Sequence, residues 1–276
     1  MAVESGRKLK QLDVGGLRIN FYEDGSGADL VLLHGMFGDY LDWEPVLELL
    51  ARRFHVVASD LPGFGESGKP DVAYTSEFFV GSLDGFFSAL GLKEIILAGN
   101  SFGGQIAMLY ALRYPEKVSQ LVLVDSGGFR GVPEAERAMA RTILSRENLL
   151  AMPAPMIPLI FSKVFVKESA EKERYLAKQT AKLKTADYPE YVRAVVQSIE
   201  LSMATNLLED LPKIKCPVLL LSGKEDSVVP PEQAEEAARR LPHATLEMME
   251  GCGHMPQMEE PEEFARRVAG HIFKKR

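Results

Sequence analysis

Cysteine and basic residues are scarce in this chain, and long apolar runs are missing from its sequence. Two cysteines in 276 residues, Cys216 and Cys252, are too few for a disulfide framework, and we expect them to be reduced thiols. The 32 Lys and Arg residues are outnumbered by 39 Asp and Glu residues. The resulting net charge of -7 argues against nucleic acid or an anionic membrane surface as a partner. No apolar run approaches the length of a membrane span, so no membrane partner is expected.

The N-terminal stretch also lacks something, namely the apolar segment of a signal peptide. Residues 1–10 are polar and charged, so we expect a cytoplasmic protein. A chain of this length suits one large α/β domain or a domain with an insertion. Its core can be large enough to fold without disulfides or metals, and we expect neither a metal nor a cofactor.

Strand patterns alternate with helical patterns over most of the chain. A hairpin is predicted over residues 8–22, and continuous apolar runs predict buried strands at 30–33, 55–58, 95–98 and 121–124. Two further strands are predicted at 217–222 and 245–249. Helices are predicted at 42–53, 76–90, 105–113, 231–240 and 261–273. This alternation predicts an α/β fold with a mostly parallel sheet and helices on both faces. Ligands of such sheets bind at the carboxyl ends of the strands.

The strand pattern is interrupted between Phe129 and Leu208, after the sixth predicted strand. Helical, charged stretches are predicted there at 134–150, 167–184 and 189–207. The proline-rich stretch 152–158 is expected to form neither regular helix nor central strand. We therefore expect a core made of residues 1–128 and 209–276, with a helical insertion at 129–208.

A serine stands between two glycines at the point where a strand pattern gives way to a helical pattern. Gly99-Asn100-Ser101-Phe102-Gly103 matches G-x-S-x-G, the pattern of a sharp strand-to-helix turn with an exposed serine. Glycines are needed there because side chains would collide with the neighbouring strand and helix. The pattern also occurs in structural loops, so other groups must support a catalytic interpretation.

A serine hydroxyl needs a general base within reach, and the base needs an acid that orients it. Among five histidines, His254 is the favoured base, because it follows the last strand in a glycine-rich loop. His34 is expected to shape its own loop instead. Asp226 and Asp125 both follow buried strands and compete to orient the base, and Asp226 is favoured because it lies one strand before the histidine. Asp60 precedes the serine and is expected to be structural.

Together these motifs resemble those of capped α/β-hydrolases over essentially the whole chain. The matching segments are His34-Gly35, 60–67, 99–104, 223–226 and Gly253-His254. The resemblance implies that Ser101 is the nucleophile, that His254 is the base and then the acid, and that Asp226 orients it. It also implies that residues 129–208 form a helical cap over the site.

The same resemblance implies an oxyanion hole made by the backbone N–H groups of Met36 and Phe102. A substrate pocket is expected between core and insertion, lined by Trp43, Met152, Ile157, Phe161 and Met255. Methionine suits adaptable apolar binding, although these residues could equally pack the insertion onto the core. The expected partner is a small-molecule ester, and the chain is expected to be a monomer or a homodimer.

The residue at the turn narrows the chemistry within this resemblance. Haloalkane dehalogenases and epoxide hydrolases carry Asp where this chain has Ser101, whereas a serine leads to an acyl-enzyme that water hydrolyses. Carboxylesterases, C–C hydrolases of meta-cleavage products and cofactor-free perhydrolases remain. Asn100 and Trp43 resemble the C–C hydrolases, but Met255 stands where they carry Trp. An esterase for short to medium apolar acyl groups is therefore the leading prediction, and a non-catalytic ligand receptor is the alternative outside enzymes.

Overall fold

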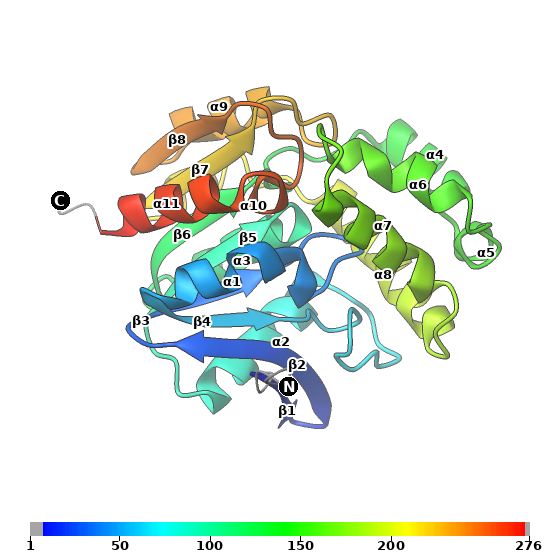
Figure 1. The fold of residues 1–276 in the computed structure, drawn as a ribbon, viewed down its shortest axis with the longest axis horizontal. Helices are drawn as coiled ribbons and strands as arrows, with labels where there is room; N and C mark the ends of the chain where they lie inside the picture. The colour runs from blue at the N-terminus through cyan, green and yellow to red at the C-terminus, as the bar shows by residue number, and fades with distance from the viewer. Residues whose placement is uncertain (1–7, 274–276) are drawn as a thin grey trace, which may run out of the picture.

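An eight-stranded sheet forms the centre of the protein, with strand order β1-β2-β4-β3-β5-β6-β7-β8 (Figure 1). The computed structural model describes residues 8–273. The β1–β2 and β2–β4 pairs are antiparallel, and the remaining strand pairs are parallel. The strands are β1 (Leu9–Val14), β2 (Leu17–Gly25), β3 (Ala28–Leu33), β4 (Phe54–Ser59), β5 (Ile95–Asn100), β6 (Val118–Val124), β7 (Val218–Gly223) and β8 (Ala244–Met249). The predicted mostly parallel sheet is confirmed.

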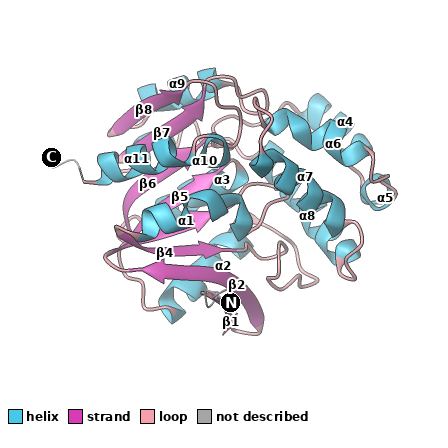
Figure 2. Cartoon of the chain, viewed as in Figure 1, coloured by secondary structure: helices cyan, strands magenta, loops and turns pink. Residues whose placement is uncertain are grey.

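Helices cover both faces of the sheet (Figure 2). One face carries α2 (Ser76–Ala89), α3 (Phe102–Arg113) and α9 (Pro231–Arg240), and the other carries α1 (Glu44–Ala51), α10 (Pro256–Glu259) and α11 (Pro261–Ile272). Successive residues of β3 point to opposite faces, so Val31 and Leu33 enter one core cluster while Leu30 and Leu32 enter the other. This two-sided burial explains why the strands appear in the sequence as continuous apolar runs.

The segment between β6 and β7 is helical and lies beyond the end of the sheet toward which the parallel strands point (Figure 1). Its α-helices are α4 (Glu134–Ile143), α5 (Arg146–Leu150), α6 (Met156–Phe161), α7 (Ala170–Lys182) and α8 (Tyr188–Ala204). We call it the α4–α8 segment. Two sequence expectations for it were wrong. Residues 134–150 form two helices, because Ser145 caps α5 with its side chain, and α6 begins inside the proline-rich stretch. Pro158 is tolerated there because the first N–H groups of a helix have no intrahelical acceptor.

The structure bears only in part on the expected cytoplasmic location and on the expected reduced thiols. Residues 1–7, which belong to the polar stretch used to predict a cytoplasmic location, lie outside the described residues. Within residues 8–273, every helix is too short or too polar to cross a membrane. Cys252 is buried and forms no disulfide, and burial raises the pKa of its thiol to about 12. A thiol that stays protonated is a poor nucleophile, so Cys252 is not a candidate nucleophile beside Ser101.

Candidate active site

Ser101 stands at the turn between β5 and α3, with φ +55° and ψ -115°. Few residues other than glycine adopt such a backbone conformation, which stores strain. A Cβ on Gly99 would lie 2.4 Å from the carbonyl carbon of Gly103, and a Cβ on Gly103 would lie 2.3 Å from the Leu33 oxygen. Both glycines are therefore required by close backbone packing, and the strained residue between them is the serine.

The turn leads directly into the N-terminus of α3. The Ser101 carbonyl accepts hydrogen bonds from the N–H groups of Gln105 and Gly127, both at 3.1 Å. Phe102 is the first residue of the helix, so its N–H has no intrahelical acceptor, and the helix dipole places partial positive charge there. An anion that forms beside Ser101 would therefore meet a donor that is already oriented.

His254 and Asp226 come from the loops after β8 and β7, and both are buried. His254 Nδ1 lies 2.7 Å from Asp226 Oδ2. Asp226 Oδ1 accepts hydrogen bonds from the N–H groups of Val228 at 2.7 Å and Val229 at 3.1 Å, which hold the carboxylate in place. The short contact assigns the proton to Nδ1, and Nε2 is then the nitrogen that can accept a proton.

Asn100 joins the serine turn to the histidine loop. Its Nδ2 donates to the His254 carbonyl at 3.0 Å and to the Val124 carbonyl at 3.2 Å. A Cβ on Gly35 would lie 3.3 Å from Ser101 Cβ, so the loop after β3 borders the serine as well. Sequence reasoning used Asn100 only as a family signature, because the variable position of the motif gives no sign of this contact.

His34 fixes the loop formed by residues 34–38, which we call the oxyanion loop. Its Nε2 accepts a hydrogen bond from the Leu61 N–H at 2.9 Å, and its Nδ1 donates to the Gly35 carbonyl at 2.8 Å. Burial lowers the pKa of His34 to about 4, so the ring is neutral and can accept at one nitrogen. Gly38 N–H also donates to the Gly35 carbonyl, at 3.1 Å. Because N–H and C=O point in opposite directions in a trans peptide, these bonds also orient the Met36 N–H.

Asp125, the competing carboxyl group, lies next to Asp226 and is bonded to β7. Its Oδ1 accepts hydrogen bonds from Ser222 Oγ at 3.0 Å and from the Gly223 N–H at 2.8 Å. Burial and the neighbouring Asp226 raise the pKa of Asp125 well above its usual range, which favours the neutral carboxyl group. Within the described residues, these carboxyl groups are not part of a cluster of three or more metal-binding side chains. The carboxyl group in contact with His254 is Asp226.

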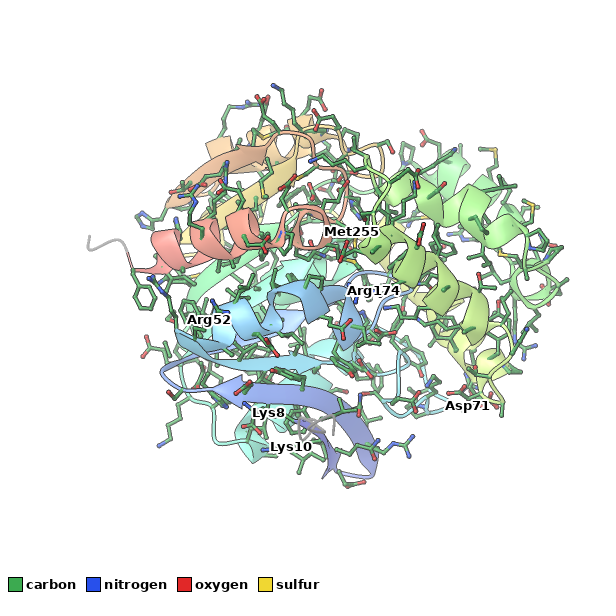
Figure 3. The ribbon with its side chains drawn as sticks, in the orientation of Figure 1. Lys8, Lys10, Arg52, Asp71, Arg174 and Met255 are labelled. Atoms are coloured by element: carbon green, nitrogen blue, oxygen red, sulfur yellow. The ribbon has the colours of Figure 1, made fainter. Side chains whose placement is uncertain are left out.

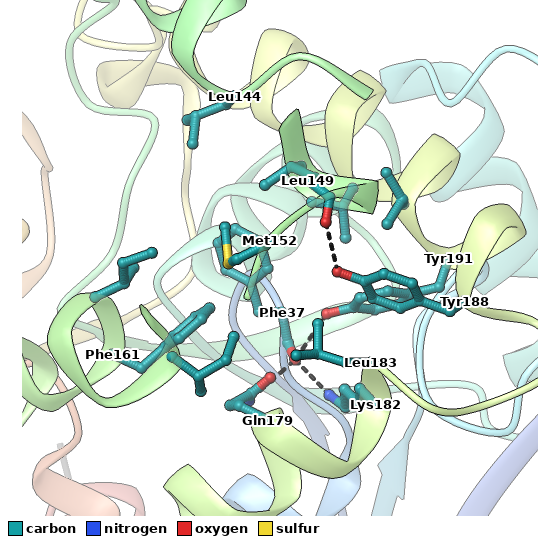
Figure 4. Close-up of a pocket in the computed structure, with 14 residues that line it drawn as sticks. Phe37, Leu144, Leu149, Met152, Phe161, Gln179, Lys182, Leu183, Tyr188 and Tyr191 are labelled. Carbon is teal, nitrogen blue, oxygen red and sulfur yellow. Dashed lines mark hydrogen bonds between the residues drawn. The ribbon is translucent and has the colours of Figure 1, made fainter. Parts of the chain in front are cut away.

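An apolar cavity of about 50 Å³ lies between the oxyanion loop and the α4–α8 segment (Figure 4). Its fourteen lining residues include three that were predicted from the sequence, Met152, Ile157 and Phe161, and Phe37 enters from the oxyanion loop. Ser101 and His254 are not among the lining residues, and Phe37 is the lining residue that belongs to the oxyanion loop.

The polar side chains of this cavity donate to backbone carbonyl groups. They are Gln179, Lys182, Tyr188 and Tyr191. Gln179 Nε2, Lys182 Nζ and Tyr191 OH all donate to the Phe37 carbonyl, at 3.3, 2.5 and 3.3 Å (Figure 4). Tyr188 OH donates to the Leu149 carbonyl at 2.9 Å. The surface left for a ligand is mainly apolar. Sequence reasoning missed this convergence, because the donors lie more than 140 positions from Phe37.

Trp43, which was expected in the substrate pocket, is not among the residues that line this cavity. The side chain is fully buried, and its ring centroid lies 6.0 Å from that of Phe264. It directly precedes α1 and belongs to the core cluster on the α1–α11 face of the sheet. Met255 packs with Ile157 and Phe161 at the boundary between core and α4–α8 segment (Figure 3). Met255 thus lies near the cavity without lining it.

Known proteins similar to this chain include several hydrolases. A family model described as "Alpha/beta hydrolase family" matches residues 30–267. Lipase 1 of Psychrobacter immobilis is 31% identical, over 95% of this chain and 83% of the lipase. The 2-hydroxy-6-oxo-2,4-heptadienoate hydrolase of Pseudomonas putida is 27% identical, over 92% of both chains. The solved structure of a thermophilic esterase from Thermogutta terrifontis is similar with a TM-score of 0.82 and 26% identity, over 97% of both chains. These names differ in substrate, so the similarities support a reaction class and leave the substrate open.

Proposed function

Because this chain belongs to the alpha/beta hydrolase family, we propose that it is a serine hydrolase that cleaves carboxylic esters with short to medium apolar acyl groups. The observation that carries the proposal is the strained turn at Ser101 beside the buried His254–Asp226 pair. The bond from Asn100 to the His254 carbonyl ties these two parts together.

In the proposed reaction, Ser101 Oγ attacks the ester carbonyl carbon while His254 Nε2 takes the hydroxyl proton. The carbonyl π electrons move to oxygen, and the N–H groups of Met36 and Phe102 stabilise the resulting anion. Collapse of this intermediate expels the alkoxide, which receives the proton from His254. Water then attacks the acyl-enzyme by the same steps and releases the acid. Asp226 stays ionised throughout and stabilises the imidazolium.

We infer further that residues 129–208 act as a cap on a core formed by 1–128 and 209–276. The apolar cavity supports that division, because it is lined by Phe37 of the oxyanion loop together with residues of the α4–α8 segment. In this arrangement Met152, Ile157 and Phe161 contact the acyl chain, and Met255 supports them from the core side.

The cavity also favours an ester with a neutral acyl group over an anionic C–C hydrolase substrate. Its volume is about 50 Å³, whereas one water molecule needs ~10–15 Å³ by the same measure, so a short acyl group fits without rearrangement. Its one cation, Lys182, is already bound to the Phe37 carbonyl and to Asp39. A substrate carboxylate would therefore have to displace existing bonds.

A substrate panel tests the proposal. We expect p-nitrophenyl esters from acetate to octanoate to be hydrolysed, with a preference for the shorter chains, and a vinylogous diketo acid to be left intact. Ser101→Ala should abolish turnover while leaving the circular dichroism spectrum unchanged. Activity retained in that variant would exclude Ser101 as the nucleophile. Faster cleavage of the diketo acid would favour the C–C hydrolase, and peracid formation would favour the perhydrolase. Labelling by a fluorophosphonate without turnover of any ester would favour a receptor.

A further inference from the structure

We propose that the α4–α8 segment positions the oxyanion hole, and that Lys182 is the main positioning residue. Lys182, with Gln179 and Tyr191, holds the Phe37 carbonyl, which belongs to the same peptide group as the Gly38 N–H. The Gly38 N–H donates to the Gly35 carbonyl, which belongs to the same peptide group as the Met36 N–H. Hydrolysis then requires this segment to be docked on the core. The inference rests on the proposed roles of Ser101 and Met36.

The backbone at Phe37 needs external support. Its φ of +65° lies in the left-handed region, which bulky residues other than glycine rarely adopt. Such conformations persist only where the surroundings hold them in place. Three donors from α7 and from α8 meet at its carbonyl oxygen (Figure 4), and its ring packs edge-on against Phe161 of α6 with centroids 5.1 Å apart. Both the carbonyl and the ring of Phe37 are thus held by the α4–α8 segment.

The oxyanion loop is held from two sides. On the core side, His34 Nδ1 donates to the Gly35 carbonyl at 2.8 Å. On the other side, Lys182 Nζ donates to the Phe37 carbonyl at 2.5 Å. The N–H of Met36, the proposed oxyanion donor, belongs to the same peptide group as the Gly35 carbonyl, and the Gly38 N–H belongs to the same peptide group as the Phe37 carbonyl. The Gly38 N–H donates to the Gly35 carbonyl at 3.1 Å, so release of the Phe37 carbonyl would weaken this bond and let the peptide of the Met36 N–H rotate out of the hole.

Lys182 differs from its neighbour Lys178 in that it donates a hydrogen bond to the Phe37 carbonyl. Lys178 Nζ lies 2.8 Å from Asp39 Oδ1 and 2.6 Å from Asp42 Oδ1, so it links α7 to the core by ion pairs alone. Lys182 also faces Asp39, at 3.3 Å, but it additionally reaches the Phe37 carbonyl. Removal of either ammonium group therefore weakens docking, whereas only loss of Lys182 removes a bond to the oxyanion loop.

This difference supplies the experiment, which compares Lys182→Met with Lys178→Met. With p-nitrophenyl butyrate, Lys182→Met should lower kcat ~10–100-fold, somewhat less than the loss of a complete oxyanion donor, with little change in KM. Affinity for butylboronic acid, whose adduct with serine is tetrahedral, should fall in parallel. Lys178→Met should keep kcat and boronate affinity, even if it lowers Tm. Equal losses of kcat in both variants, or an effect of Lys182→Met on KM alone, would overturn the proposal.

Two further measurements keep the test decisive. If Lys182→Met does not fold, Tyr191→Phe removes one donor to the Phe37 carbonyl without removing a charge, and it should lower kcat with KM unchanged. An unchanged kcat would then count against the proposal. If the wild-type protein hydrolyses no ester, the proposed function is wrong. Amide hydrogen exchange then tests whether Lys182 holds the oxyanion loop. Lys182→Met should speed exchange in residues 35–38 more than Lys178→Met does, and equal exchange would overturn it.

Discussion

At the scale of single residues, two neighbouring aspartates have different surroundings. Asp226 accepts two backbone N–H bonds and faces the ring of His254. Asp125 is bonded to β7 and lies beside Asp226, and burial together with the charge of that neighbour raises the pKa of Asp125 well above the usual range. The geometry therefore favours Asp226 as the partner of His254, and the raised pKa favours a neutral hydrogen-bonding role for Asp125.

This assignment predicts different effects for two matched substitutions. Asp226→Asn should lower kcat by ~10⁴, because an amide cannot hold the imidazole tautomer or stabilise the imidazolium. Asp125→Asn should have a far smaller effect, because an amide resembles a neutral carboxyl group in shape and charge. Steady-state kinetics on a p-nitrophenyl ester measures both. A larger loss of kcat in Asp125→Asn than in Asp226→Asn would show that Asp125 is the carboxyl group that orients His254.

The relative positions of the candidate residues were predictable from the sequence where they depend on local motifs and chain order. Ser101, His254 and Asp226 were proposed from loops that follow strands, and the parallel sheet brings such loops to one edge. The true surroundings of Trp43 and Lys182 could not be predicted in this way. Trp43 packs against a helix more than 200 residues away, and Lys182 reaches a carbonyl group in a distant loop. Neither contact leaves a periodic pattern in the sequence.

At the scale of elements, the strands and long helices of the core followed from hydrophobic periodicity, whereas the short helices did not. Helix α9 was predicted with its observed bounds, and α11 to within one residue. Between β6 and β7, side-chain capping by Ser145 divides one predicted helix into two. The free energy gained from such a cap decides whether one helix ends and the next begins, and hydrophobic periodicity gives no information about it.

The carboxylate of Glu259 links α10 to the loop of His254 and to the α4–α8 segment. Glu259 of α10 accepts hydrogen bonds from the Val166 N–H at 2.7 Å and from the Gly253 N–H at 2.6 Å. The His254 N–H itself donates to the Val164 carbonyl at 2.9 Å. The histidine loop is therefore tied both to α10 and to the short helix η2 (Ser162–Val164) of the α4–α8 segment.

We predict that Glu259→Gln destabilises the protein and slows the reaction. The amide has one acceptor oxygen where the carboxylate has two, so one backbone N–H loses its partner at a cost of ~1–3 kcal/mol. Urea unfolding should show this loss, and kcat should fall because the loop of His254 is less firmly held. Glu263→Gln is the control, because its ion pairs with Arg266 and Arg267 lie on the exposed side of α11. Equal effects of the two substitutions would contradict the anchoring role.

At the scale of the whole molecule, the candidate site exists only where core and α4–α8 segment meet. Ser101, the proposed nucleophile, His254, the proposed base, and His34 belong to the core, but the oxyanion loop is also held by Lys182 and its neighbours in the α4–α8 segment. The division of the chain into these parts followed from the disappearance of the strand pattern. The contacts between the two parts could not be predicted from the sequence. Ion pairs such as Lys178–Asp42 join positions that look like ordinary surface charges in the sequence.

The neutral buried ring of His34 makes the stability of the whole fold depend on pH. Its pKa is lowered by burial to about 4, whereas an unfolded chain binds a proton at about 6.5. The unfolded state therefore takes up a proton as pH falls from about 6.5 to about 4, while the folded state does not, so the stabilising contribution is complete above this window and is lost through it. The shift corresponds to about 3 kcal/mol.

We therefore predict that wild type loses its stability advantage over His34→Gln as the solution is acidified. Gln can accept the Leu61 N–H but does not titrate, so the difference in unfolding free energy should shrink by about 3 kcal/mol between neutral pH and pH ~4. Asp60, whose pKa burial raises to about 6, acts in the opposite direction, but it is present in both proteins and drops out of the difference. Urea unfolding of both proteins across this pH range makes the measurement. A difference that stays constant with pH would mean that His34 binds a proton as readily in the folded protein as in the unfolded chain. The neutral ring at low pH, and with it the core-side support inferred for the orientation of the Met36 N–H, would then be contradicted.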